Sequence, residues 1–230
     1  VDRAVRRRRP SGGPGRVRFV LDDDDNPGNA PPSGTSVGTT TALAGGAPQT
    51  SLTVTVTHLA DGRYVGHAVY TAPQDFIRSA ADNPLATRPI RVRATFIDAS
   101  NAEYTLPLRS LDLYRVPVLY VHGMWGGTKS FEWPLLNDAR WIIHRSDYSA
   151  THDAAFSQNA GMPTRVVAEL RKEINDRGIA GTRFFVFAHS MGAVLFKIYM
   201  GGTGAPYARA DNFFAGDVYA LVSVDAPFFG

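Results

Sequence analysis

The segment that decides the fold prediction is FFVFAHSMGAVLF, residues 184–196. Phe184–Ala188 is an uninterrupted apolar run, which is typical of a strand buried on both faces of a parallel sheet. The residues from Met191 to Met200 predict a short apolar helix. Ser190 therefore stands in a tight turn between them, with the small residues Ala188 and Gly192 two positions before and after it. This context predicts a nucleophile elbow, whose strained turn lifts the serine hydroxyl out of the sheet edge.

A second motif, HGMWGG, occupies residues 122–127, directly after the apolar run Val116–Val121. Acyl-transfer enzymes with an elbow serine hold the oxyanion with two backbone N–H groups. One follows the nucleophile, here Met191, and the other comes from a loop after an earlier strand, here Met124. Four further residues are predicted to support these two loops rather than to take protons: His122, Gly123, His189 and Gly192.

The segments around these motifs alternate between strands and helices. Short apolar runs at Trp141–His144 and Ala220–Val224 predict two more buried strands, and Pro163–Arg177 has the period of a helix. This alternation predicts an α/β fold for residues 116–230, with a doubly wound, mostly parallel sheet. Asp225 ends the last of these strands, at the sheet edge where catalytic groups gather, and is a weak candidate for a catalytic acid.

The first half of the chain has a different pattern. Residues 51–115 contain stretches of alternating polar and apolar residues, such as Ser51–Thr57 and Ile90–Ile97, and predict a small β-rich domain. Val17–Leu21 predicts one strand within residues 1–50, which otherwise predict a disordered leader of low complexity.

Composition and charge limit the classes of function. The 230 residues include no cysteine, which excludes disulfides, thiolate catalysis and cysteine-ligated zinc. The net charge of +3 comes from residues 1–18, which carry seven Arg and one Asp; the other residues carry −3. No basic face with interleaved aromatic residues follows, so we expect no nucleic-acid partner. No apolar run approaches the length of a membrane span. Asp22–Asp25 is a weak candidate for calcium, and we expect no other cofactor.

Three stretches together resemble the α/β-hydrolase superfamily, specifically its bacterial lipases and esterases: VPVLYVHGMWGG, FFVFAHSMGAVLF and NFFAGDVYALVSVDAPFFG. The resemblance covers Val116–Gly230 and implies hydrolysis of small-molecule or lipid carboxylic esters through an acyl-enzyme on Ser190. It also implies a secreted, extracytoplasmic protein. Phe228 departs from the Pro-His-x-Gly motif of the family by replacing its histidine.

The family order is serine, then acid, then histidine, and no histidine follows Ser190. We therefore expect the base beyond Gly230 and the chain of 230 residues to be inactive toward esters. Two alternatives stay open: an amidase or acyl transferase of the same fold, and a non-catalytic binding protein with a degenerate hydrolase fold. Three aromatic residues after the oxyanion loop are predicted to line an acyl pocket or to pack in a helix core: Trp125, Phe131 and Trp133.

Overall fold

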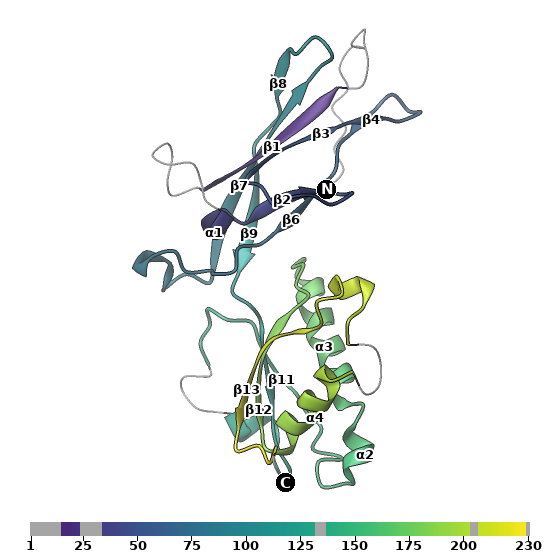
Figure 1. Cartoon of the computed structure of the whole chain (residues 1–230). Helices are drawn as coiled ribbons and strands as arrows, with labels where there is room; N and C mark the ends of the chain where they lie inside the picture. Colours follow the sequence, from purple (N-terminus) through teal and green to yellow (C-terminus); the bar gives the residue numbers. More distant parts are fainter. Residues whose placement is uncertain (1–14, 24–33, 132–136, 203–206, 229–230) are drawn as a thin grey trace. The chain divides into compact units, whose positions relative to one another are not determined.

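The computed structural model describes residues 15–23, 34–131, 137–202 and 207–228. The chain forms two compact units, Val1–Leu113 (unit 1) and Tyr114–Gly230 (unit 2) (Figure 1). Strands make up 34% and helices 22% of the described residues. The predicted fold class, a doubly wound and mostly parallel α/β-hydrolase sheet behind a small β-rich domain, is wrong. The chain is strand-rich, with several small antiparallel sheets and one parallel sheet of four strands.

Unit 1 is built on an antiparallel sheet in the order β3-β1-β7-β8, with β9 also paired to β7. Its strands are β1 (Arg16–Asp23), β3 (Ser51–Thr55), β7 (Thr87–Ile97), β8 (Glu103–Thr105) and β9 (Arg109–Tyr114). Two hydrogen-bonded pairs accompany it, β2 (Thr39–Ala42) with β6 (Ala68–Thr71) and β4 (Thr57–His58) with β5 (Tyr64–Val65). The described residues of the unit also include a short helix, α1 (Gly34–Val37), and a 3₁₀ turn at Ala80–Asp82.

The core of unit 1 includes Val37, which lies in a segment that the sequence predicted to be disordered. Leu21, Val37, Ile90 and Leu113 form one buried cluster, to which Tyr70 adds its ring and a hydrogen bond from its hydroxyl to the Val37 carbonyl. The segment 34–42 was predicted as part of the disordered leader because of its Gly, Ser and Thr content, and this prediction is wrong. Burial of Val37 and pairing of β2 with β6 order it instead, and these long-range contacts have no local sequence signal.

Unit 2 holds the parallel sheet, in the order β11-β10-β12-β13 (Figure 1). The strands are β10 (Val118–Val121), β11 (Ile143–Arg145), β12 (Phe184–His189) and β13 (Val218–Val224). Its helices are α2 (Phe156–Asn159), α3 (Met162–Asp176) and α4 (Met191–Met200), with 3₁₀ turns at Thr128–Phe131 and Ala210–Asn212. The predicted apolar strand at 184–188 and the predicted helices at 163–177 and 191–200 are confirmed as β12, α3 and α4.

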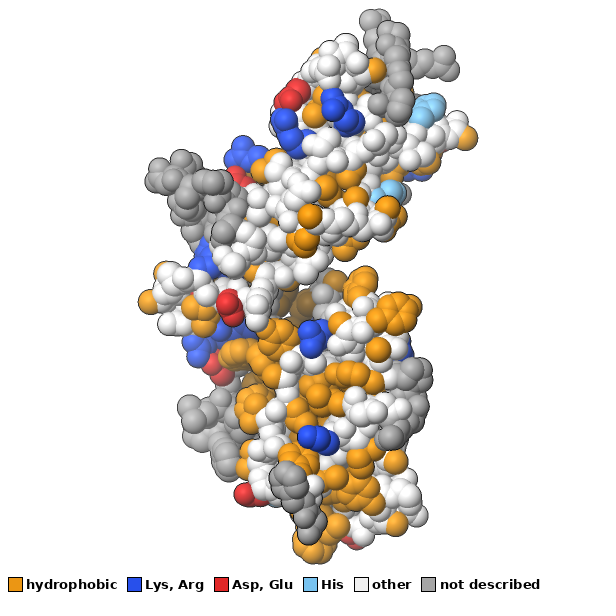
Figure 2. Space-filling view, viewed as in Figure 1, with side chains coloured by type: hydrophobic (Ala, Val, Ile, Leu, Met, Phe, Trp, Pro, Cys, Tyr) orange, Lys and Arg blue, Asp and Glu red, His pale blue; other side chains and the backbone are white. Residues whose placement is uncertain are grey.

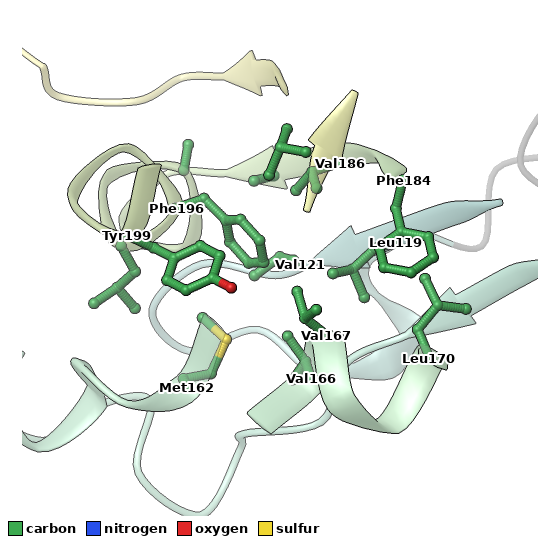
Figure 3. Close-up of a cluster of buried hydrophobic side chains, with 14 of the residues drawn as sticks. Leu119, Val121, Met162, Val166, Val167, Leu170, Phe184, Val186, Phe196 and Tyr199 are labelled. Carbon is green, nitrogen blue, oxygen red and sulfur yellow. The ribbon is translucent and has the colours of Figure 1, made fainter. Parts of the chain in front are cut away.

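Helices α3 and α4 pack on the same face of this sheet. Figure 3 shows Val166 and Leu170 of α3 and Phe196 of α4 directed into one cluster with the alternate strand residues, among them Leu119 and Val186. The opposite face carries a separate cluster around Val118 and Tyr120, with Trp141, Ile143, Phe185 and Phe187 packed against it. A doubly wound sheet needs helices on both faces. The apolar runs correctly indicated buried strands, but periodicity does not tell which face each helix covers.

Candidate active site

Ser190 connects β12 to α4 in a strained backbone conformation. Its φ is 49° and its ψ is −124°, a combination that costs a non-glycine residue on the order of 1–3 kcal/mol. The surrounding structure holds it there. Its N–H donates to the Val224 carbonyl of β13 at 2.8 Å, and its own carbonyl accepts from the Ala193 N–H of α4 at 3.1 Å. A strained serine at the carboxyl end of a central parallel strand is the local geometry of a nucleophile elbow.

Gly123 brings the loop after β10 directly against this serine. A Cβ atom at position 123 would lie 2.8 Å from the Ser190 Cβ and 2.8 Å from the His189 Nδ1. These separations are shorter than van der Waals contact, so only glycine fits here without a shift of the backbone. The sequence motifs 122–127 and 188–192 are therefore neighbours in space.

Gly192 allows the same close approach from the helix side. A Cβ atom at this position would lie 2.5 Å from the His122 carbonyl oxygen and 2.8 Å from Val121 Cγ1. The first turn of α4 therefore rests on the end of β10. Gly192 fits the small residue that the elbow requires two positions after its serine, and Gly123 lets the loop approach that serine closely.

The loop 122–127 turns back on itself through a backbone bond from the Gly126 N–H to the Gly123 carbonyl at 3.2 Å. Trp125 takes a left-handed φ of 58° in this turn and is 80% exposed. This exposure fits neither of the two alternatives predicted for Trp125, the lining of an acyl pocket and packing in a helix core. Trp133 and the side chain of Phe131 lie outside the described residues.

The two predicted oxyanion donors belong to the two segments that meet at Ser190, the first turn of α4 and the loop 122–127. Met191 is the first residue of α4, where a helix leaves its N–H without an intrahelical acceptor. Met124 follows Gly123, whose backbone touches the serine. Within the part of the chain that the structure describes, neither amide has a hydrogen-bond acceptor. Both N–H groups are thus available to a ligand oxygen, and the helix dipole adds positive potential at Met191.

Asp225 occupies the same edge of the sheet. It follows β13 directly, one residue after Val224, whose carbonyl accepts the Ser190 N–H. Its side chain is exposed, and its φ of 48° is again left-handed. Two non-glycine residues with positive φ, Ser190 and Asp225, therefore directly follow the neighbouring strands β12 and β13. The conformation of Ser190 is the strained one of the two, and strain of this kind clusters at functional sites, where the surrounding structure holds it in place.

His122 anchors the loop rather than serving as a base. It is buried, its Nδ1 lies 2.9 Å from the Gly123 carbonyl, and its Nε2 accepts from the Tyr148 N–H at 3.4 Å. These contacts fix the neutral tautomer with the proton on Nδ1. Burial lowers the pKa of His122 below its usual value, and the nearby His152 lowers it further. Both ring nitrogens are engaged, so no lone pair is free to accept a proton from Ser190.

Tyr148 is a supporting residue that sequence reasoning missed. Its ring stacks on His122 with centroids 4.0 Å apart and an angle of 6° between planes, and its hydroxyl donates to the His122 carbonyl. Burial raises the pKa of the Tyr148 phenol to about 12. The contact joins residues 26 positions apart in sequence, so the local pattern around Tyr148 does not predict it.

The other three described histidines of unit 2 form no hydrogen bond with the Ser190 hydroxyl. His144 on β11 is 3.1 Å from Glu173 of α3, within the layer between sheet and helix. His152 lies edge-on to His122, with ring centroids 6.1 Å apart. His189 precedes the serine and lies against Gly123. No histidine among the described residues forms a hydrogen bond with Ser190.

Asp217 directly precedes β13, at the end of the strand opposite Asp225, and has a structural role. This buried carboxylate accepts from Arg209 at 2.9 Å and from the Tyr199 hydroxyl, and pairs with Arg171 at 3.0 Å. Burial and the adjacent carboxylate raise the pKa of Tyr199 to about 12. The network fastens the loop before β13 to α3 and α4.

The predicted calcium site at Asp22–Asp25 is only partly described. Asp22 accepts from Arg93 at 3.0 Å, while Asp24 and Asp25 lie outside the described residues, as do the basic residues Arg6–Arg9. Within the described ranges, no group of three His, Asp or Glu side chains is placed to hold a metal ion. None of the helices in those ranges is long and apolar enough to cross a membrane.

Comparison with known proteins adds no further constraint. No protein-family model matches the chain, and no curated protein matches it. The geometry around Ser190 is therefore the basis for assigning a function.

Proposed function

We propose that the protein is a serine hydrolase that cleaves carboxylic esters through an acyl-enzyme on Ser190. One observation carries the proposal: Ser190 is held in a strained turn between β12 and α4 with the Gly123 backbone packed against it. The proposal does not depend on the predicted fold class, which is wrong for the chain. It depends on a serine, two available amides and an acidic side chain at one sheet edge.

In the first step, the Ser190 Oγ attacks the ester carbonyl carbon and its proton passes to a general base. The carbonyl oxygen becomes an oxyanion, and the N–H groups of Met124 and Met191 donate to it. The leaving alkoxide takes the proton as the C–O bond breaks, which leaves an acyl-Ser190. Water then hydrolyses this ester by the same sequence. One such amide donor is typically worth about 10²–10³ in turnover.

The proposed base is a histidine oriented by a carboxylate, and Asp225 is the candidate carboxylate. Its position beside the partner of the Ser190 N–H supports this role. His122 is excluded by its two hydrogen bonds, and the other described histidines do not bond Ser190. The base is therefore the component of the proposal that the described residues do not supply.

Apolar surface beside the serine favours esters with an apolar part. Met124 is 39% and Trp125 is 80% exposed, and both belong to the loop that touches Ser190. Figure 2 shows hydrophobic side chains gathered at the lower end of unit 2, where β12 and β13 end in Figure 1. Exposed apolar surface at a site marks a ligand or interface of similar character.

A fluorophosphonate probe on the full-length natural protein tests this proposal. We expect peptide mapping to place the phosphonate on Ser190 and Ser190→Ala to abolish labelling. Ser223→Ala is a matched control, because Ser223 lies on β13 opposite Ala188 and should not react. A labelled protein would then be tested on esters, on amides and with alcohol acceptors, because amidases and acyl transferases share this site. Labelling that survives in Ser190→Ala would refute the assignment.

A second candidate is a non-catalytic binding protein. The observation in its favour is the lack of a hydrogen bond between Ser190 and any described histidine. A folded full-length protein whose Ser190 resists the probe would favour this candidate over the hydrolase.

A further inference from the structure

The direction of the Met124 N–H is set by the carbonyl group of Gly123, because the two groups belong to one planar peptide. In a trans peptide the N–H and the C=O point in opposite directions. Two donors hold the Gly123 carbonyl: His122 Nδ1 lies 2.9 Å from its oxygen, and the Gly126 N–H donates to it at 3.2 Å. The Met124 N–H is therefore held on the side of its peptide that faces away from both donors.

The His122 ring can hold this carbonyl in only one of its two neutral tautomers. A carbonyl oxygen only accepts hydrogen bonds, so Nδ1 must carry the proton and Nε2 must lack one. The Tyr148 N–H, which only donates, meets Nε2 at 3.4 Å. Burial lowers the pKa of His122, so the ring stays neutral and keeps this pattern at neutral pH. The backbone of Tyr148 thus selects the tautomer that donates to Gly123.

The side chain of Tyr148 holds the preceding peptide of the same loop. Its hydroxyl donates to the His122 carbonyl, and its ring stacks on the His122 ring with centroids 4.0 Å apart. Tyr148 is 3% exposed and belongs to the main core cluster of unit 2, so packing fixes its own position. A Cβ atom at Gly192 would lie 2.5 Å from the same carbonyl oxygen, so this peptide also supports the first turn of α4.

We propose that Tyr148 is a positioning residue of the oxyanion site, which orients the Met124 N–H through His122. It rests on the proposed function, because the oxyanion forms only if Ser190 attacks an ester. The contacts of Tyr148 and His122 restrain two successive peptides, so the donor is in place before the oxyanion forms. Donors that are held in advance need no reorganisation during the reaction.

Tyr199 is the matched residue that separates positioning from stability. It is also a buried tyrosine of unit 2, and its hydroxyl donates to the buried Asp217, which precedes β13 at the end of the strand away from Ser190. Tyr148→Phe and Tyr199→Phe each remove one buried hydroxyl and keep the ring. Both should lower the urea concentration at which unit 2 unfolds, but only Tyr148→Phe should change the oxyanion donor.

The kinetics of fluorophosphonate attachment to the full-length protein test the proposal. Saturation kinetics separate binding of the probe from the rate constant for phosphonylation of Ser190. Tyr148→Phe should lower the rate constant about tenfold and leave binding unchanged, because a donor held less firmly costs less than the 10²–10³ of a donor removed. His122→Phe keeps a flat ring against Tyr148 but removes the Nδ1 donor, so it should lower the rate constant at least as much. Tyr199→Phe should react at the unmodified rate.

A second measurement follows the amide itself and does not need the reaction. In protein with isotope-labelled methionine, the residual dipolar coupling of the Met124 N–H reports its direction relative to the amides of Met162 and Met200. We expect this coupling to change in Tyr148→Phe and to stay the same in Tyr199→Phe.

The two measurements distinguish failure of the positioning role from failure of the hydrolase. If the unmodified protein reacts at Ser190, then an unchanged Met124 coupling or an unchanged rate constant in Tyr148→Phe would overturn the positioning role. Equal losses of rate in Tyr148→Phe and Tyr199→Phe would also overturn it. An unmodified protein that never reacts would refute the hydrolase, and the Met124 coupling would then decide by itself whether Tyr148 orients this amide.

Discussion

Substitution of Gly123 by alanine perturbs the contact on which the candidate site is built. The new methyl group would lie 2.8 Å from the Ser190 Cβ, an atom held by the strained elbow, and 2.8 Å from the His189 ring. Neither neighbour is the free end of a flexible side chain, so the loop 122–127 must move. Overpacking of this kind typically costs about 1–3 kcal/mol. We expect the free energy of unfolding of unit 2 to fall by that amount.

The matched control is Gly127→Ala in the same loop. A Cβ atom at position 127 has no heavy atom within 4 Å, so the free energy of unfolding should change by less than about 0.5 kcal/mol. Urea unfolding followed by tryptophan fluorescence measures both variants. The three tryptophans of the chain, at positions 125, 133 and 141, all belong to unit 2, so the signal reports this unit.

The movement of the loop 122–127 in Gly123→Ala should also slow the reaction of Ser190 with the probe. Movement of the loop takes the Met124 amide away from Ser190, so phosphonylation of Ser190 in folded, full-length Gly123→Ala should slow by about 10²-fold or more. Gly127→Ala should react at the unmodified rate. Equal stability and equal reactivity of the two variants would refute the contact between the loop and the elbow.

Three further predictions concern the supports of the site. Ser190→Gly should raise the free energy of unfolding of unit 2 by about 1 kcal/mol in urea titrations, because relief of strain outweighs the added freedom of the unfolded chain; Ser190→Ala, which keeps the strain, should not. Asp217→Ala should lower it by about 3–5 kcal/mol, because Arg171 and Arg209 lose their buried partner. The exposed Asp211→Ala should cost less than about 1 kcal/mol, and equal losses would contradict a structural role for Asp217. The pKa of His122 in the folded state lies below its unfolded value of about 6.5, so the unfolded state binds more protons. Unit 2 should therefore lose stability as the pH falls below about 6.5. A His122→Gln variant should not show this pH dependence.

Local patterns were sufficient for the elements around Ser190. The apolar run 184–188 and the helical periods at 163–177 and 191–200 depend on neighbours in sequence, and β12, α3 and α4 follow them. The same patterns do not say that α3 and α4 share one face of the sheet, because that choice depends on the length and path of the connections. This is why the doubly wound architecture was predicted incorrectly.

The candidate site likewise combines features that local sequence patterns predict with features that they do not. The small residues Gly123 and Gly192 could be assigned from their motifs, and their surroundings leave no room for a side chain. The stacking of Tyr148 on His122 and the left-handed φ of Asp225 could not. The stacking joins residues distant in sequence, and an aspartate adopts both negative and positive φ, so its identity alone does not fix the angle.

The most direct measurement of the central claim is the site and rate of fluorophosphonate attachment to the full-length protein. The proposed function predicts a single modified peptide that contains Ser190, with no modification after Ser190→Ala. Modification at another serine, or an unmodified Ser190 in a protein whose unfolding shows unit 2 intact, would contradict it.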